Sequence, residues 1–160
     1  MELAIIGLGK MGMNMAIRLM RGGHRVVGYA RTPATVDEAV KNGAEGAHSL
    51  EEAVSKLNAP RIVWAMVPAG KATDDTINQL SNLLGKGDII IDGGNSNYKD
   101  SARHAAELEP KGIEFLDCGT SGGIWGLSEG YSLMIGGKPE VVETMRPIFE
   151  TLAPTADKGW

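Results

Sequence analysis

Short runs of β-branched and aliphatic residues recur along the chain, and segments with helix signals separate them. Six of these runs occupy residues 3–6, 25–29, 61–67, 88–91, 113–116 and 131–135. Runs that are apolar at nearly every position are typical of strands buried on both faces, as in a parallel sheet whose crossovers are helices. The alternation therefore predicts an α/β fold with a doubly wound, mostly parallel sheet.

Capping and periodicity signals place helices between these strands. Pro33 follows Thr32 at the first position of one helix, and Ser49 with Glu52 three residues later forms a capping box for another. The expected helices cover residues 11–21, 33–43, 50 onward, 72–84, 98 onward and 139–152. The inner face of the last helix is expected to carry Val142, Met145 and Phe149.

Length, composition and charge limit the class of protein. The 160 residues suffice for one domain, and a net charge of −4 without basic blocks argues against a nucleic-acid partner, which would need a basic face. The longest purely apolar run, residues 62–67, is far shorter than the about 20 residues of a membrane helix. The N-terminus also lacks the pattern of a signal peptide. We therefore expect a cytoplasmic protein without a membrane partner.

Cysteine and histidine usage gives no sign of a disulfide or a metal site. Cys118 is the only cysteine, so an internal disulfide is excluded, and we expect it to be a buried, inert thiol. His24, His48 and His104 lack the spacing of metal ligands. No metal cofactor is expected.

A glycine-rich turn joins the first strand to the first helix, with the sequence Gly7-Leu8-Gly9-Lys10-Met11-Gly12. In a Rossmann-type fold, Gly7 would allow the tight turn, Gly9 would let backbone N–H groups approach a pyrophosphate, and Gly12 would let the helix pack closely on the strand. The positive end of the helix dipole would then point at the phosphates. A glycine turn that binds no ligand is the alternative, since such turns are common.

The end of the second strand indicates which dinucleotide binds. An acidic residue there favours NAD, but this chain reads Tyr29-Ala30-Arg31-Thr32. Ala30 brings no carboxylate that would repel a 2′-phosphate, and Arg31 offers a charged, planar fork for phosphate oxygens. The pattern favours NADP over NAD. The alternative is that Arg31 is a solvated residue at the start of a helix.

With further segments included, the chain resembles the cofactor domain of the decarboxylating 6-phosphogluconate dehydrogenases of the pentose phosphate pathway, in the β-hydroxyacid dehydrogenase superfamily. The resemblance is carried by residues 7–14, 63–69, 92–98 and 121–137 and extends over essentially all 160 residues. It implies a single NADP-binding Rossmann domain over residues 1–160. Arg31 and Thr32 match the family's cofactor stretch, in which Ala30 replaces the usual asparagine.

The resemblance also implies roles for three later segments. Val67, Pro68 and Ala69 would contact the cofactor, and Asn95 would contact cofactor and substrate. In the superfamily's substrate segment, Ser121, Gly122 and Gly123 would bind the carboxylate end of the hydroxyacid. The residues alone also allow an alternative for each segment. Residues 67–69 could end a core strand and form its turn, Asn95 could be a turn-forming residue, and residues 121–123 could be a surface loop.

The family's catalytic lysine and glutamate match no motif in this chain, and we expect them in a helical substrate and dimerisation domain beyond Trp160. The expected protein is thus the cofactor-binding part of a homo-oligomeric enzyme that converts 6-phosphogluconate to ribulose 5-phosphate with NADP, and this chain would bind cofactor without turnover. Two alternatives are a related dehydrogenase of the 3-hydroxyisobutyrate type and a non-catalytic dinucleotide-binding module.

Overall fold

One sheet of seven strands organises the computed structural model, which describes residues 1–155. The strands run in the order β3-β2-β1-β4-β5-β6-β7, parallel except for the antiparallel pair β6 and β7. Their bounds are β1 Glu2–Ile6, β2 Arg25–Tyr29, β3 Glu45–Ala47, β4 Ile62–Ala65, β5 Ile89–Asp92, β6 Glu114–Ser121 and β7 Ser132–Gly136. The expected α/β fold with a doubly wound, mostly parallel sheet is confirmed.

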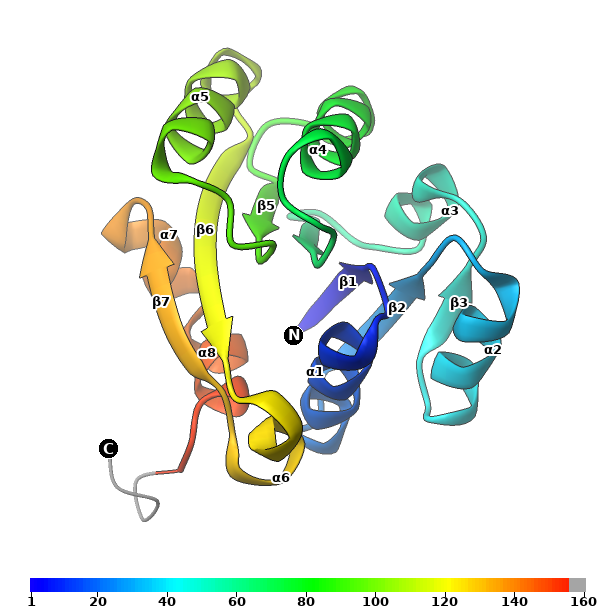
Figure 1. Ribbon diagram of the computed structural model, residues 1–160. Helices are drawn as coiled ribbons and strands as arrows, with labels where there is room; N and C mark the ends of the chain where they lie inside the picture. The colour runs from blue at the N-terminus through cyan, green and yellow to red at the C-terminus, as the bar shows by residue number, and fades with distance from the viewer. Residues whose placement is uncertain (156–160) are drawn as a thin grey trace.

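Helices cover both faces of the sheet (Figure 1). The described helices are α1 Lys10–Arg21, α2 Pro33–Lys41, α3 Leu50–Ser55, α4 Lys71–Leu83, α5 Tyr98–Leu108, α6 Gly126–Glu129, α7 Pro139–Thr144 and α8 Arg146–Leu152, with two short 3-10 turns, η1 Glu109–Lys111 and η2 Gly123–Trp125. One core packs α1, α7 and α8 on the sheet, and a second packs α3, α4 and α5 on the opposite face. None of the described helices is long and apolar enough to cross a membrane.

The parallel register brings the carboxyl ends of the central strands together at one edge of the sheet. Beyond the strands themselves, Gly7 N donates to Tyr29 O at 2.9 Å, Met66 N to Ile6 O at 2.6 Å, and Gly93 N to Ala65 O at 2.9 Å. These bonds extend the ladder by one residue into each turn. The turns after β1, β4 and β5 therefore lie side by side, where ligands of open α/β sheets bind.

Three details differ from the sequence expectation. The edge strand β3 was not expected, because its three residues carry no apolar run. Strand β6 continues to Ser121 rather than ending at residue 116, because antiparallel pairing with β7 holds residues 117–121. The expected last helix is broken into α7 and α8 at Met145, two residues before Pro147, which cannot donate the backbone hydrogen bond of a continuous helix.

The break changes which residues of this last segment face the core. Met145 and Phe149 are buried as expected, but Val142 is only partly buried. Val141 and Ile148 are buried as well. The burial of Cys118, 1% exposed, is confirmed, and burial raises the pKa of its thiol to about 12.

The partly buried Arg18 ties α1 to the end of the described chain. Its Nε donates to Thr151 O at 2.8 Å, its Nη1 to Leu127 O at 3.1 Å and its Nη2 to Ala153 O at 2.9 Å. One guanidinium thus satisfies carbonyl groups at the ends of α6 and α8. Because α1 follows the glycine turn directly, this clamp also fixes the helix on which the candidate site is built.

Arg18→Ala is expected to lower the free energy of unfolding by about 2 kcal/mol, because three partly buried carbonyls lose a charged donor. Urea unfolding followed by circular dichroism measures the change. Arg21→Ala removes an exposed arginine from the same helix and should change stability by less than about 0.5 kcal/mol. Equal effects of the two substitutions would contradict the role of the clamp.

Candidate cofactor site

The three glycines of the turn after β1 are required for different reasons. Gly7 has φ +98°, and a Cβ there would collide with the carbonyl oxygen of Met66. A Cβ on Gly12 would collide with the carbonyl oxygen of Gly7, so this glycine lets α1 approach the strand end. Gly9 differs, because a Cβ there would meet no described atom within 4 Å. The open space over Gly9 is where a ligand can approach the backbone.

Helix α1 starts at this open space without a capping side chain. Gly9 is its N-cap, no side chain accepts a hydrogen bond from the first turn, and no acidic residue lies in that turn. Backbone N–H groups there remain available, and the helix dipole places positive potential at them. The arrangement suits a phosphate group.

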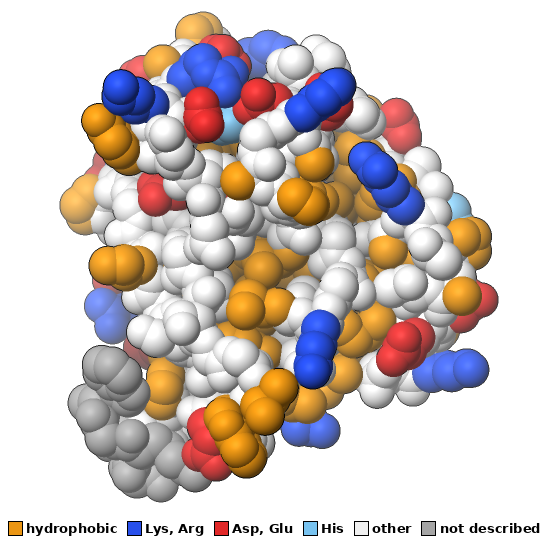
Figure 2. All heavy atoms as spheres, viewed as in Figure 1, with side chains coloured by type: hydrophobic (Ala, Val, Ile, Leu, Met, Phe, Trp, Pro, Cys, Tyr) orange, Lys and Arg blue, Asp and Glu red, His pale blue; other side chains and the backbone are white. Residues whose placement is uncertain are grey.

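A cleft of about 700 Å³ opens beside the turn, a size within the usual range for ligand sites. The cleft is lined by residues that follow β1, β2 and β4 and by one side of α4. They include Gly7, Leu8, Gly9, Ala30, Arg31, Thr32, Met66, Val67, Pro68, Ala72, Asp75, Thr76 and Gln79. Figure 2 shows the molecule hollowed in the middle of one face, where hydrophobic side chains gather and Lys and Arg side chains lie at the margin.

The predicted 2′-phosphate residues lie on the rim of this cleft. Arg31 is exposed and forms no ion pair with any residue among 1–155. Thr32 is the N-cap of α2, as expected, but its hydroxyl makes no capping hydrogen bond, so it remains available to a ligand. The one acidic residue in the described lining, Asp75, is engaged by Lys71 at 2.9 Å. Arg31 is therefore the one basic residue among the described residues that line the cleft.

The side chains of the other residues in the glycine motif, Leu8, Lys10 and Met11, differ in their surroundings. The Leu8 side chain is buried against Gly28, and the partly buried Met11 packs on the core. Lys10 is exposed at the first turn of α1. Neither Lys10, Met11 nor Gly12 lines the cleft itself.

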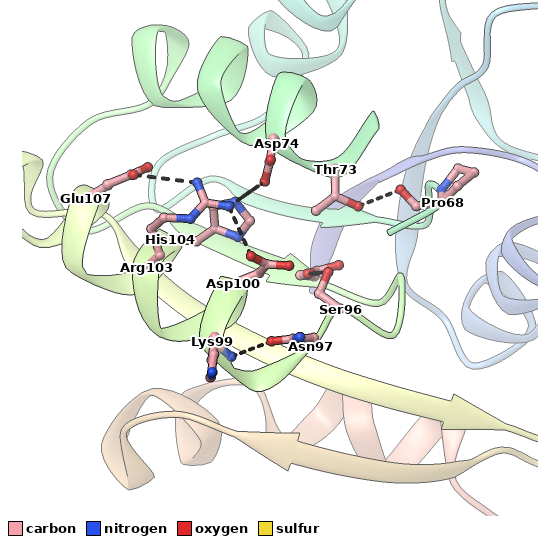
Figure 3. Close-up of polar contacts among 11 residues, drawn as sticks. Pro68, Thr73, Asp74, Ser96, Asn97, Lys99, Asp100, Arg103, His104 and Glu107 are labelled. Carbon is pink, nitrogen blue, oxygen red and sulfur yellow. Dashed lines mark hydrogen bonds and ion pairs between the residues drawn. The ribbon is translucent and has the colours of Figure 1, made fainter. Parts of the chain in front are cut away.

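The segment after β4 forms the opposite wall. Val67 and Pro68 line the cleft, whereas Ala69 is exposed outside it. The hydroxyl of Thr73 donates to Pro68 O at 2.8 Å and holds the turn against the first turn of α4, as Figure 3 shows. The expected cofactor residues of this segment are thus partly brought together with the glycine turn.

The predicted substrate residues lie further along the same edge of the sheet. Asn95 follows β5 with φ +58°, and its Oδ1 is 3.7 Å from the position that a Cβ on Gly119 would take. Ser121 is the last residue of β6 and is exposed. Residues 118–121 pair only with β7, which leaves their other edge open next to Asn95. These residues share the sheet edge with the cleft but do not line it.

The two glycines after Ser121 differ in what surrounds them. A Cβ on Gly122 would lie 2.8 Å from the ring of the buried Tyr131, so packing alone explains this glycine. Gly123 has φ +51° and open space around it, which leaves it accessible to a ligand. Of the pair, Gly123 is the better supported as a binding residue.

The helices that follow β4 and β5 are joined by an ion-pair cluster (Figure 3). Asp74 on α4 accepts a hydrogen bond from Arg103 at 3.0 Å and lies 2.7 Å from His104 Nε2, both on α5. The hydrogen bond from Arg103 is the main cause that lowers the pKa of Asp74.

Within residues 1–155, no group of three or more His, Cys, Asp or Glu side chains could hold a metal ion.

Sequence comparison decides the family. Residues 2–159 match the model of the NAD binding domain of 6-phosphogluconate dehydrogenase. The chain belongs to this family. Decarboxylating 6-phosphogluconate dehydrogenases of Schizosaccharomyces pombe and Ovis aries are 48% identical over 160 residues and 44% identical over 163 residues. The structure is therefore that of the family's NAD(P)-binding Rossmann domain.

The match covers only part of these relatives. The chain aligns over 97% and 99% of its own length with the two proteins, but spans 32% and 34% of theirs, and 51% of a Bacillus subtilis relative that is 45% identical. A solved 6-phosphogluconate dehydrogenase of Plasmodium falciparum superposes with a TM-score of 0.91 at 32% identity, over 99% of this chain and 35% of that one. A Mycobacterium tuberculosis 3-hydroxyisobutyrate dehydrogenase gives 0.87 at 28% identity, over 95% and 52%.

Sequence reasoning missed the wall of the cleft that α4 provides. Ala72, Thr76 and Gln79 lie on α4, and the apolar spacing of this helix predicts only the face that packs on the core. Their spacing of three and four was a usable signal, because it places them together on one side of the helix, beside its buried face. The missed signal was thus the side of this correctly predicted helix that adjoins its buried face.

Gly9→Ala is expected to fold normally, because φ −64° suits any residue and the Cβ meets no protein atom. It should weaken dinucleotide binding at least tenfold by filling the space of the pyrophosphate. Gly7→Ala should instead lower the melting temperature, since its Cβ collides with Met66 O. Calorimetric titration and thermal unfolding separate the two effects, and a Gly9→Ala protein with unchanged affinity would refute the placement of the ligand.

Proposed function

We propose that this chain binds NADP in preference to NAD and is the cofactor-binding part of an enzyme that oxidatively decarboxylates 6-phosphogluconate to ribulose 5-phosphate. The observation that carries the proposal is the shared cleft of Gly9 and Arg31, with open backbone amides at one and an unengaged guanidinium at the other. The Plasmodium falciparum relative is described in complex with NADP+ and with 6-phosphogluconate, which supports both ligands.

Different residues along the edge of the sheet bind different parts of the cofactor and the substrate. Amides at the start of α1 bind the pyrophosphate, Arg31 and Thr32 bind the 2′-phosphate, and Val67 with Pro68 confines the cofactor from the β4 side. When bound, NADP supplies the hydride acceptor for oxidation of the substrate hydroxyl. Asn95, Ser121, Gly122 and Gly123 hold the substrate, with small residues and one hydroxyl facing its carboxylate. This chain alone is proposed to bind without turnover.

A related hydroxyacid dehydrogenase is the second candidate, because the Mycobacterium tuberculosis 3-hydroxyisobutyrate dehydrogenase shares the fold at 28% identity. Higher identity to the 6-phosphogluconate enzymes, at 44% and 48%, favours the first. A non-catalytic dinucleotide-binding module would bind the same cofactor. The gene's downstream reading frame distinguishes this module from the two enzymes, because both enzymes require a further helical domain.

Arg31→Ala should reduce the ratio of NADP affinity to NAD affinity by about 10- to 100-fold, because a hydrogen bond to a charged group contributes about 1.5–3 kcal/mol. NAD binding should be nearly unchanged, because NAD has no 2′-phosphate. Isothermal calorimetry with both dinucleotides provides the measurement.

Arg21→Ala serves as a charge-matched control, since this exposed arginine lies at the far end of α1 and does not line the cleft. It should leave the affinity ratio within about twofold. The NADP preference would be refuted if Arg31→Ala and Arg21→Ala gave the same ratio.

A further inference from the structure

A buried carboxylate holds both sides of the turn that carries Asn95. Asp92, the last residue of β5, is only 2% exposed. Its Oδ1 accepts a hydrogen bond from Gly94 N at 2.9 Å, and its Oδ2 accepts one from the Ser96 hydroxyl at 2.5 Å. The two bonds reach the residues immediately before and after Asn95. The carboxylate therefore fixes the backbone on either side of that residue.

Asn95 needs such support because of its backbone conformation. It is the one non-glycine residue within residues 1–155 with a positive φ, +58°. That region costs an L-residue about 1 kcal/mol, although asparagine tolerates it better than most. Its own amide makes no hydrogen bond with another described residue and lies near the open edge of β6. The Asn95 side chain is therefore exposed and free of hydrogen bonds to the described residues.

The same turn is wedged against the segment after β4. A Cβ on Gly94 would collide with Val67 O and would come within 3.3 Å of Thr73 Oγ1, whose proton is already given to Pro68 O. Figure 3 shows Ser96 near Thr73 of α4, with Asp74, Arg103 and His104 beside them. The turn thus has a fixed position relative to the cleft wall.

The strand order sets how far Asn95 lies from the 2′-phosphate residue. Arg31 follows β2 and Asn95 follows β5, and the intervening order is β2-β1-β4-β5. Three strand spacings of about 4.8 Å amount to about 14 Å. A dinucleotide that places its 2′-phosphate at Arg31 and its pyrophosphate at Gly9 therefore extends its nicotinamide half toward Asn95.

We infer that Asp92 is a positioning residue, which holds Asn95 in its left-handed conformation so that the amide meets the nicotinamide half of the cofactor. The inference rests on the proposed function. A purely structural role is the alternative, because removal of any buried carboxylate leaves hydrogen-bond donors unpaired. Asp88 offers the matched comparison. It precedes the same strand, is also 2% exposed, and accepts from Arg61 N at 2.7 Å and Gly85 N at 2.8 Å.

The test compares two ligands on the intact chain. NADP spans the whole edge, whereas adenosine 2′,5′-bisphosphate contains the 2′-phosphate and lacks the nicotinamide half. Asp92→Ala should raise the Kd for NADP about tenfold and leave the Kd for the bisphosphate within twofold. Asp92→Asn, whose amide can still bond both neighbours, should restore NADP affinity to within about threefold. Asp88→Ala should lower the melting temperature and change neither Kd by more than twofold.

Ser96→Ala provides a milder variant in case Asp92→Ala does not fold. It removes one of the two hydrogen bonds and should raise the Kd for NADP about threefold, with the bisphosphate unaffected. The inference is overturned if Asp92→Ala and Ser96→Ala leave NADP binding within twofold, or if these two variants weaken both ligands equally. If the unaltered chain bound neither ligand, the proposed function itself would fail, and the inference with it.

Discussion

The close backbone contact between the turn after β1 and the turn after β4 is the constraint on which the site depends. Gly7 lies against the carbonyl of Met66, Gly12 lies against the carbonyl of Gly7, and Met66 N donates to Ile6 O. No side chain fits in either contact, so both glycines are fixed by packing within the protein. The consequence is that α1 begins directly over the sheet edge, with its first amides exposed at Gly9.

The strand order places further loops on both sides of this turn, along one extended edge of the sheet. Residues that follow β2 lie on one side of the glycine turn, and residues that follow β4, β5 and β6 lie on the other. Each loop is held by its own polar contact: Pro68 by Thr73, and the Asn95 turn by Asp92. The cluster of Asp74, Arg103 and His104 then joins α4 to α5, the helices that follow these two loops.

Much of this could be predicted from the sequence, because its signals are local. The apolar runs gave β1, β2, β4 and β5 to within a few residues, and the spacing of Gly7, Gly9 and Gly12 indicated the phosphate turn. The rest depends on tertiary contacts. The extension of β6 comes from its pairing with β7, and the glycine at position 122 is explained by the ring of Tyr131. The role of Asp92 was hidden, because only its hydrogen bonds distinguish it from a strand-ending residue.

Backbone amide chemical shifts of the ¹⁵N-labelled chain, followed during titration with NADP, test the central claim most directly. The account predicts large shifts for residues 8–12 and 31–32, smaller shifts for Val67 and residues 94–96, and little change at residues 41–43, which lie on α2 and the turn after it. Saturable shifts confined to surfaces outside the glycine turn, or no shifts at millimolar NADP in a folded sample, would contradict it.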